Sequence, residues 1–207
     1  MTTRLPIAIL ISGGGTTLRN LIECQAKDSL PIDIRLVISS SVKAAGLRIA
    51  ANAGIPLRII TIGQYPDPQD FSVAYFKAIR QSGAQIVVMA GFLKYLPIPR
   101  DFENRVVNIH PSLIPEFCGA GMYGKHVHQA VLDSDNKVSG CTVHFVDNQF
   151  DHGPVIAQQI VPVLDNDTAE TLAARIFQAE CLLYPQVLRL LADGNVQVSG
   201  HPVVRVE

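Results

Sequence analysis

An asparagine and a histidine stand two residues apart at the end of a predicted strand. Residues 106–109 form a short apolar segment that contains Asn108, and His110 follows directly. Side chains two positions apart on a strand point to the same face, and parallel sheets bind ligands at the carboxyl ends of their strands. An amide donor beside an imidazole can stabilise a developing oxyanion. The alternative is a pair of hydrogen-bonded structural side chains.

Two carboxylates follow a later predicted strand, residues 139–146. Asp147 and Asp151 flank the loop after that strand. A carboxylate in this position could orient His110 and accept a proton. A polar turn without a catalytic role explains the two acids equally well.

A glycine-rich turn, SGGGTT at residues 12–17, lies between the first predicted strand and the first predicted helix. Glycines there let backbone N–H groups turn toward an anion, and the helix N-terminus adds positive potential. Leu18 replaces the third glycine of the dinucleotide fingerprint, and the next predicted strand ends in serines where a ribose-binding acid would be expected. We therefore expect a single phosphate rather than NAD at this turn, with a plain tight turn as the alternative.

Two further motifs carry weaker signals. Residues 119–125 match the pattern G-x-x-x-x-G-K, but His126 follows where a nucleotide-binding loop has Ser or Thr, and no strand precedes it. A surface loop is the better interpretation. His126 and His128 suggest a metal, yet residues two apart on a helix do not face each other and no third ligand is recognisable. We expect no metal.

Apolar strand-like segments alternate with helix-like segments along the chain. The predicted strands are residues 5–11, 32–40, 57–62, 86–90 and 106–109, followed by 139–146 and 155–163, and the predicted helices are 17–27, 44–52, 70–81 and 168–193. This order predicts a doubly wound α/β fold, a mostly parallel sheet with helices on both faces and a mixed or antiparallel extension. We expect a capping box of Asp167 and Glu170 to start the last helix. Pro185 should kink this helix and Gly194 should end it.

Length and composition indicate one globular domain over residues 1–207. Hydrophobic residues make up 48% and charged residues 17%, which excludes a disordered or coiled-coil chain. The net charge is −1, whereas nucleic-acid-binding proteins generally carry a basic excess. We therefore expect small-molecule substrates and no nucleic acid.

The cysteines and the apolar segments bear on the cellular compartment. The four cysteines form no C-x-x-C pair, so neither a zinc site nor a redox motif is indicated. The longest apolar run covers residues 86–93, whereas a membrane-spanning helix needs about 20 residues. No signal-peptide cleavage site follows the apolar N-terminal strand. These features predict a cytoplasmic protein with no membrane partner.

Five segments of the chain form a recognisable set: ISGGGTTL (11–18), AGFLKYL (90–96), NIHPSLIP (108–115), TVHFVDNQFDHGPVI (142–156) and AECLLYP (179–185). Together these segments resemble the glycinamide ribonucleotide formyltransferase family of purine biosynthesis. They appear in the family's order and spacing and cover nearly the whole chain. The resemblance implies an enzyme that transfers a formyl group from the cosubstrate 10-formyltetrahydrofolate to the amine of glycinamide ribonucleotide, without a metal.

The resemblance also implies roles for individual residues. The catalytic residues would be Asn108, His110 and Asp151. The substrate would be bound by Gly15, Thr16 and Thr17 at its phosphate and by Glu180 at its ribose. The folate would be bound by Leu93, Lys94, Tyr95, Leu96, Asn108 and Asp147.

Three departures from the family pattern bear on these roles. The turn reads GGGTT where GNGSN is common, and residues 67–71 lack the arginine that many members use for the folate. Residues 118–125 look like a short insertion, which could form a lid.

In the expected mechanism, the substrate amine attacks the formyl carbon, and Asn108 and a protonated His110 donate hydrogen bonds to the oxyanion. Asp151 raises the pKa of His110 and takes up the amine proton, directly or through water.

Three alternatives stay open. A tRNA or sugar formyltransferase would share the catalytic residues, although the tRNA enzyme should carry a further basic domain. A formyl-folate hydrolase should carry an N-terminal regulatory domain. A noncatalytic nucleotide-binding module is the alternative from another class. The pattern is compatible with a monomer or a homodimer.

Overall fold

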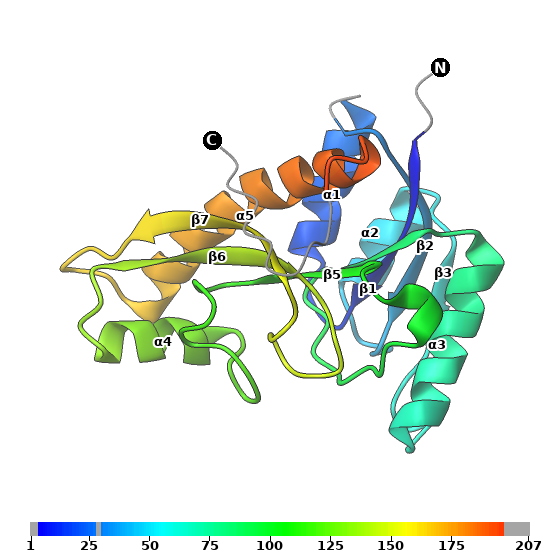
Figure 1. Cartoon of the computed structure of the whole chain (residues 1–207), viewed down its shortest axis with the longest axis horizontal. Helices are drawn as coiled ribbons and strands as arrows, with labels where there is room; N and C mark the ends of the chain where they lie inside the picture. Colours follow the sequence, from blue (N-terminus) through cyan, green and yellow to red (C-terminus); the bar gives the residue numbers. More distant parts are fainter. Residues whose placement is uncertain (1–3, 28–29, 197–207) are drawn as a thin grey trace.

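A computed structural model describes residues 4–27 and 30–196 of the chain (Figure 1). In these residues seven strands form one sheet in the order β3-β2-β1-β4-β5-β6-β7. The strands are β1 (Leu5–Ile11), β2 (Ile32–Ser39), β3 (Leu57–Ile59), β4 (Ile86–Met89), β5 (Val106–His110), β6 (Val138–Phe145) and β7 (Val155–Pro162). The strands from β3 to β5 pair in parallel, and β6 and β7 are antiparallel. This confirms the predicted doubly wound, mostly parallel sheet with an antiparallel extension.

Helices cover both faces of the sheet, because the central strands are apolar on both faces. In β1, Ile7, Ile9 and Ile11 pack toward one core, whereas Ala8 and Leu10 pack toward the other. The first core is shared with α1 (Thr16–Ala26), α2 (Gly46–Asn52), α4 (Lys125–Asp133) and α5 (Ala169–Ala192). The second is shared with α3 (Pro68–Ser82) and the short 3₁₀ helix η1 (Arg100–Phe102). One layer of helices therefore covers each face of the sheet, as the βαβ pattern predicts.

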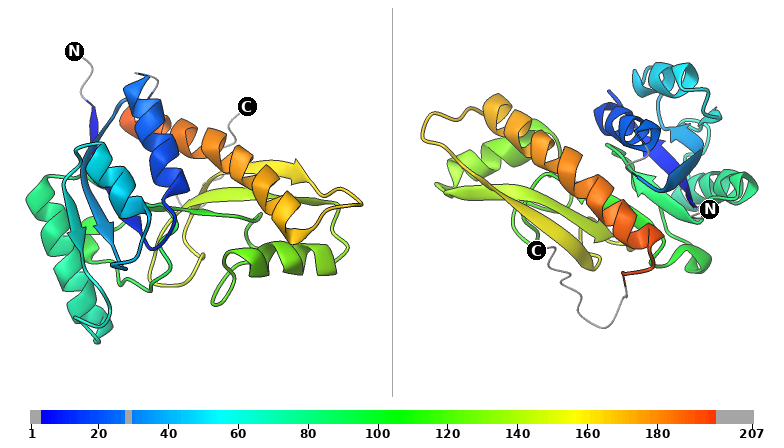
Figure 2. Two further views of the ribbon diagram at one scale, coloured as in Figure 1. Left: turned by 180° about the vertical axis from the view of Figure 1, so that it is seen from behind. Right: turned by 90° about the horizontal axis from the view of Figure 1, so that it is seen from above.

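The antiparallel extension gives the molecule an elongated outline. Seen from above in Figure 2, β6, β7 and the beginning of α5 extend to one side, and the helices of the N-terminal half lie at the other. The α5 helix contacts β6, β7, α4 and α1 and so joins the two ends. None of the helices in the described ranges has the length and apolar character needed to cross a bilayer.

Local signals explain where α3 begins and ends. The Asp67 carboxylate accepts hydrogen bonds from the backbone of Gln69 and Asp70, and Pro68 occupies the first helical position. Gly83 follows the helix in the left-handed conformation, with φ of 73°. The prediction of 70–81 is therefore correct in its centre and short at both ends.

The capping box predicted for α5 is wrong in its residues. Thr168 and Thr171 form it, by exchanging side-chain and backbone hydrogen bonds. Asp167 is engaged by the Arg175 guanidinium at 2.6 and 2.8 Å, and Glu170 forms an ion pair with Lys125. The helix is continuous through the position of Pro185 and ends before Gly194, as expected for its end.

The sequence pattern does not predict α4. Its buried residues, Val127, His128 and Val131, form a narrow stripe in which a histidine takes an apolar position. Three glycines with positive φ, at 119, 121 and 124, precede it and keep the chain irregular up to Lys125. The signal for a helix is therefore weak on both counts.

Candidate active site

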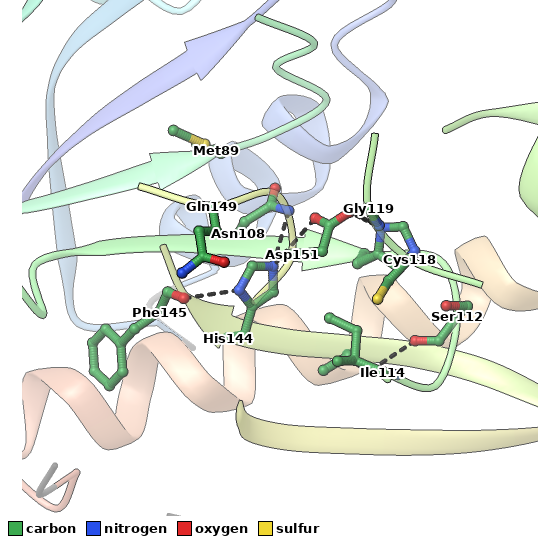
Figure 3. Close-up of polar contacts among 12 residues, drawn as sticks. Met89, Asn108, Ser112, Ile114, Cys118, Gly119, His144, Phe145, Gln149 and Asp151 are labelled. Carbon is green, nitrogen blue, oxygen red and sulfur yellow. Dashed lines mark hydrogen bonds and ion pairs between the residues drawn. The ribbon is translucent and has the colours of Figure 1, made fainter. Parts of the chain in front are cut away.

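The carboxyl end of β5 brings the two predicted polar side chains to one place. Asn108 and His110 lie on β5, and the antiparallel register places His144 of β6 directly opposite Asn108. Figure 3 shows Asn108, His144 and Asp151 pointing toward one another. Asp151 comes from the loop between β6 and β7. Residues from two strands and one loop therefore form a single cluster.

His110 is held by a hydrogen bond at Nε2 and is only 4% exposed. Its Nε2 lies 2.8 Å from the carbonyl of Phe117, and because a carbonyl only accepts, Nε2 carries the proton. Its Nδ1 lies 3.5 Å from Oδ2 of Asp151. In the neutral ring, Nδ1 carries a lone pair that faces the Asp151 carboxylate.

Burial in the free site acts against the expected protonation of His110, which stays a prediction for the reaction. Burial lowers the pKa of His110, and although the Asp151 charge and the Phe117 hydrogen bond act in the opposite direction, they do not offset it. A neighbouring His144 lowers it further. Since the ordinary value is 6.5, His110 is mostly neutral at neutral pH.

Asp151 is the carboxylate of the cluster. Burial alone would raise its pKa, but His144, the nearby His110 and the Gly119 N–H together lower it below its ordinary value. Oδ2 accepts the Gly119 N–H at 3.0 Å, and Oδ1 lies 3.7 Å from Nε2 of His144. Asp151 is therefore ionised at neutral pH and faces both histidines.

Two residues beside the cluster adopt left-handed backbone conformations without being glycine. Asp151 has φ of 50° and Phe117 has φ of 52°. Such conformations cost energy and concentrate at functional sites. Here they aim the Asp151 carboxylate and the Phe117 carbonyl at the two nitrogens of His110.

His144 belongs to the cluster, although sequence reasoning gave this residue no role. Its Nδ1 donates to the Phe145 carbonyl at 2.8 Å, so its Nε2 is free to accept from the Asn108 amide at 3.2 Å. The second N–H of that amide is left for another acceptor. Only the register between β5 and β6 places His144 here, and nothing in the local sequence indicates that register.

The glycine-rich turn leads into the N-terminus of α1 at the same edge of the sheet. Gly15 has φ of 74° and stands at the N-cap without a side-chain cap, so the first N–H groups of α1 point outward. A Cβ on Gly15 would approach the Cα of Gly46 to 2.5 Å. Thr16 is exposed and Thr17 half-buried. The geometry suits an anion, and its role in binding phosphate stays a prediction.

The predicted folate segment begins at a sharp turn after β4, where Gly91 has φ of 73°. Leu93 is 54% and Tyr95 41% exposed, and Lys94 is exposed between them. Leu96 is buried in the core that includes α3, so it supports the segment from below.

The loop after β6 lies against this segment. The Tyr95 hydroxyl donates to the Asn148 carbonyl at 3.2 Å, and the Tyr95 and Phe150 rings are 5.5 Å apart. Asp147 accepts from the Gln149 backbone and pairs with His152 at 2.7 Å. The Asp147 carboxylate thus shapes the loop, and its contact with a folate stays a prediction.

Glu180 lies in the middle of α5, half-buried. Within the described part of the chain its carboxylate has no hydrogen-bond partner, and burial raises its pKa to about 7. The buried Cys141 of β6 and Tyr184 of α5 lie near enough to feel its charge. An unpartnered carboxylate of this kind could accept hydrogen bonds from a ligand, which leaves the ribose role a prediction.

Residues 119–125, which match the pattern of a nucleotide-binding loop, make contacts with Asp151 and with α5. The Gly119 N–H holds Asp151, and Lys125 forms an ion pair with Glu170 of α5. A cavity of about 470 Å³ lies at the starts of α4 and α5, and a cavity of about 540 Å³ lies beside β3. Both are lined by residues outside the cluster. Among residues 4–27 and 30–196, no three His, Cys, Asp or Glu side chains gather as a metal site.

Comparisons with known proteins agree on one family. Residues 5–188 match the model of the formyl transferase family. The phosphoribosylglycinamide formyltransferase of Vigna unguiculata chloroplasts is 38% identical over 207 residues, 98% of this chain and 66% of that protein. The trifunctional purine biosynthetic protein adenosine-3 of Gallus gallus is 40% identical over 96% of this chain, which spans only 19% of that protein.

Solved structures extend the likeness to three dimensions. The glycinamide ribonucleotide transformylase 1 of Symbiobacterium toebii superposes with a TM-score of 0.91 at 35% identity, over 99% of this chain and 94% of that chain. A formyltetrahydrofolate deformylase from Pseudomonas syringae superposes with a TM-score of 0.86 at 24% identity, over 96% of this chain and 64% of that chain. That second likeness concerns the fold alone.

Proposed function

Because this chain belongs to the formyl transferase family, we propose that it transfers a formyl group from 10-formyltetrahydrofolate to the amine of glycinamide ribonucleotide, in purine biosynthesis. The family uses a folate-derived formyl donor, and we propose 10-formyltetrahydrofolate as the donor of this protein. We also propose that residues 1–207 form one formyltransferase domain. The observation that carries it is the cluster of Asn108, His110 and Asp151 at the carboxyl end of β5.

Asn108 is the proposed oxyanion donor. When the amine attacks the formyl carbon, a carbon–nitrogen bond forms and the formyl oxygen gains negative charge. The Asn108 amide has one N–H on His144, which holds the amide in place, and the other can donate to that oxygen. No covalent enzyme intermediate is needed.

His110 is the proposed proton carrier, and Asp151 stabilises its charged form. The attacking amine must lose a proton, and the lone pair on Nδ1 of His110 can take it because that ring is neutral. The imidazolium that results lies beside the Asp151 carboxylate, which stabilises it. The same proton then passes to the departing folate nitrogen as its bond to the formyl carbon breaks.

The binding roles follow the elements around this cluster. Gly15, Thr16 and Thr17 would hold the substrate phosphate at the start of α1, and Glu180 would accept hydrogen bonds from the ribose. Leu93, Lys94 and Tyr95 would meet the folate, with Leu96 behind them and Asp147 shaping the opposite loop. The net charge of −1 supports small-molecule substrates over nucleic acid.

A single-turnover assay with 10-formyltetrahydrofolate tests this proposal. The acceptors compared are glycinamide ribonucleotide, an aminoacyl-tRNA, an amino sugar and water alone. We expect rapid formation of the formylated ribonucleotide and only slow release of formate with water. Faster transfer to another acceptor, or hydrolysis at the same rate without any acceptor, would contradict the assignment.

A further inference from the structure

Ser12 stands where the connections of the sheet diverge. It follows β1 directly, and β1 pairs with β2 on one side and with β4 on the other. The chain after β1 and β2 packs helices on one face, whereas α3, which precedes β4, covers the other face. Ligands of such sheets bind at this divergence. The ends of β1 and β4 are neighbours there, because Leu10 pairs with Met89.

One hydroxyl joins three segments at this point. Ser12 Oγ accepts the Leu93 N–H at 2.9 Å and shares a hydrogen bond with Ser40 Oγ at 2.7 Å. The Ser12 backbone N–H also donates to the Gly91 carbonyl at 3.0 Å. The glycine-rich turn, the end of β2 and the start of the proposed folate segment are thereby linked.

The folate segment has one anchor at each end. Its far end is tied to the loop that carries Asp151, since the Asn148 carboxamide accepts the Ile98 N–H at 2.7 Å and the Asn148 carbonyl accepts the Tyr95 hydroxyl. Its near end leaves β4 through the left-handed Gly91, and the exposed Leu93 is tied down by its N–H bond to Ser12.

We propose that Ser12 is a positioning residue for the formyl donor, because its hydroxyl fixes residues 91–96, the segment proposed to bind the folate. This inference rests on the proposed function of that segment. The Ser12 side chain acts through the Leu93 N–H. It takes no part in the contacts described above for His110 and Asp151. Its loss should therefore weaken donor binding more than it slows the chemical step.

Ser12→Ala, Ser12→Thr and Ser40→Ala separate this role from a general structural one. Alanine removes the acceptor for the Leu93 N–H but keeps the backbone bond to Gly91. Threonine keeps the hydroxyl. Ser40→Ala removes the bond between the two serines and leaves the bond to Leu93 in place, so it is the matched control.

The measurements are the Kd for tetrahydrofolate by calorimetry and the KM of both substrates with kcat. We expect Ser12→Ala to raise the Kd and the donor KM about tenfold, as loss of one partly buried hydrogen bond allows. The KM for glycinamide ribonucleotide and kcat should change by less than about threefold, and Ser12→Thr and Ser40→Ala should bind the folate like wild type.

Unchanged folate binding in Ser12→Ala, or an equal loss in Ser40→Ala, would overturn the inference. If Ser12→Ala does not fold, Ser12→Cys keeps the volume with a poor acceptor, and wild-type folate binding in that variant would overturn it equally. A wild-type protein that binds no tetrahydrofolate would contradict the proposed function itself.

Discussion

Replacing Glu180 by glutamine should stabilise the protein at alkaline pH. Burial raises the pKa of Glu180 from 4.5 to about 7 in the folded state, whereas the unfolded chain loses this proton near the ordinary value. Between these two values the folded state binds more protons than the unfolded state, so the stability of the wild type falls as the pH rises. Above pH 7 the folded protein carries a buried carboxylate that glutamine does not have.

The size of the effect follows from the interval between the two pKa values. At about 1.4 kcal/mol per pH unit, the interval from 4.5 to about 7 corresponds to at most about 3 kcal/mol. Because Glu180 keeps some exposure, we expect about 2 kcal/mol at pH 8. For a domain of this size that is a rise in Tm of roughly 4–8 °C.

Urea unfolding and calorimetry of Glu180→Gln and wild type at pH 8 and pH 5 measure this difference. The gain should be largest at pH 8 and shrink severalfold at pH 5, where the folded wild type keeps its proton. Glu23→Gln, on the exposed face of α1, is the control and should show no such dependence. A Glu180→Gln protein that is no more stable than wild type at pH 8, or whose gain is the same at both pH values, would refute the burial argument.

Three further substitutions probe the site. His110→Ala should slow single-turnover formyl transfer by about 10²–10³-fold with an unchanged circular dichroism spectrum, and near wild-type rates would show that His110 has no catalytic role. Asp151→Asn should lower kcat and move the His110 limb of the pH–rate profile to lower pH, because the carboxylate raises the pKa of that histidine; a profile superimposable on wild type would count against the pair. Gly15→Val should weaken binding of glycinamide ribonucleotide in calorimetry far more than folate binding, because φ of 74° and the contact with Gly46 exclude a side chain; equal losses for both ligands would indicate a damaged fold.

The parallel half of the fold could be predicted because its signals are local. Short apolar strands alternate with helices whose ends carry turn residues, such as the Gly83 that ends α3. The capping box of α5 was predicted one residue too early. Asp167 and Glu170 are residue types that form such boxes, but Thr168 and Thr171 make the hydrogen bonds. Arg175 and Lys125 attract the two acids instead, and those contacts are not visible in the spacing of residues.

The sequence predicted that Asn108, His110 and Asp151 lie together, and it did not predict the electrostatics around them. Asn108, His110 and Asp151 gather as expected, because the register of one strand and the sequence of one loop are enough to bring them near the same edge. The pKa of His110 is lowered mainly by burial, and the sequence does not show how deeply this side chain is buried. His144 required knowledge of which β6 residue opposes Asn108.

That pairing makes the cluster sensitive to strand register and tolerant of loop length. Slipping β6 by one residue against β5 would bring Val143 or Phe145 opposite Asn108 and carry His144 to the other face of the sheet. We expect residues 111–137, which connect the two strands, to tolerate changes in number, provided that Asp151 keeps a backbone N–H to accept and His110 keeps the Phe117 carbonyl. The segment 118–125, which we predict to be a short insertion, falls within this connection, and it supplies that N–H from Gly119. We therefore expect insertions and deletions between β5 and β6 and none within the two strands. A shift in the register of β6 should abolish enzymatic activity even where the protein still folds.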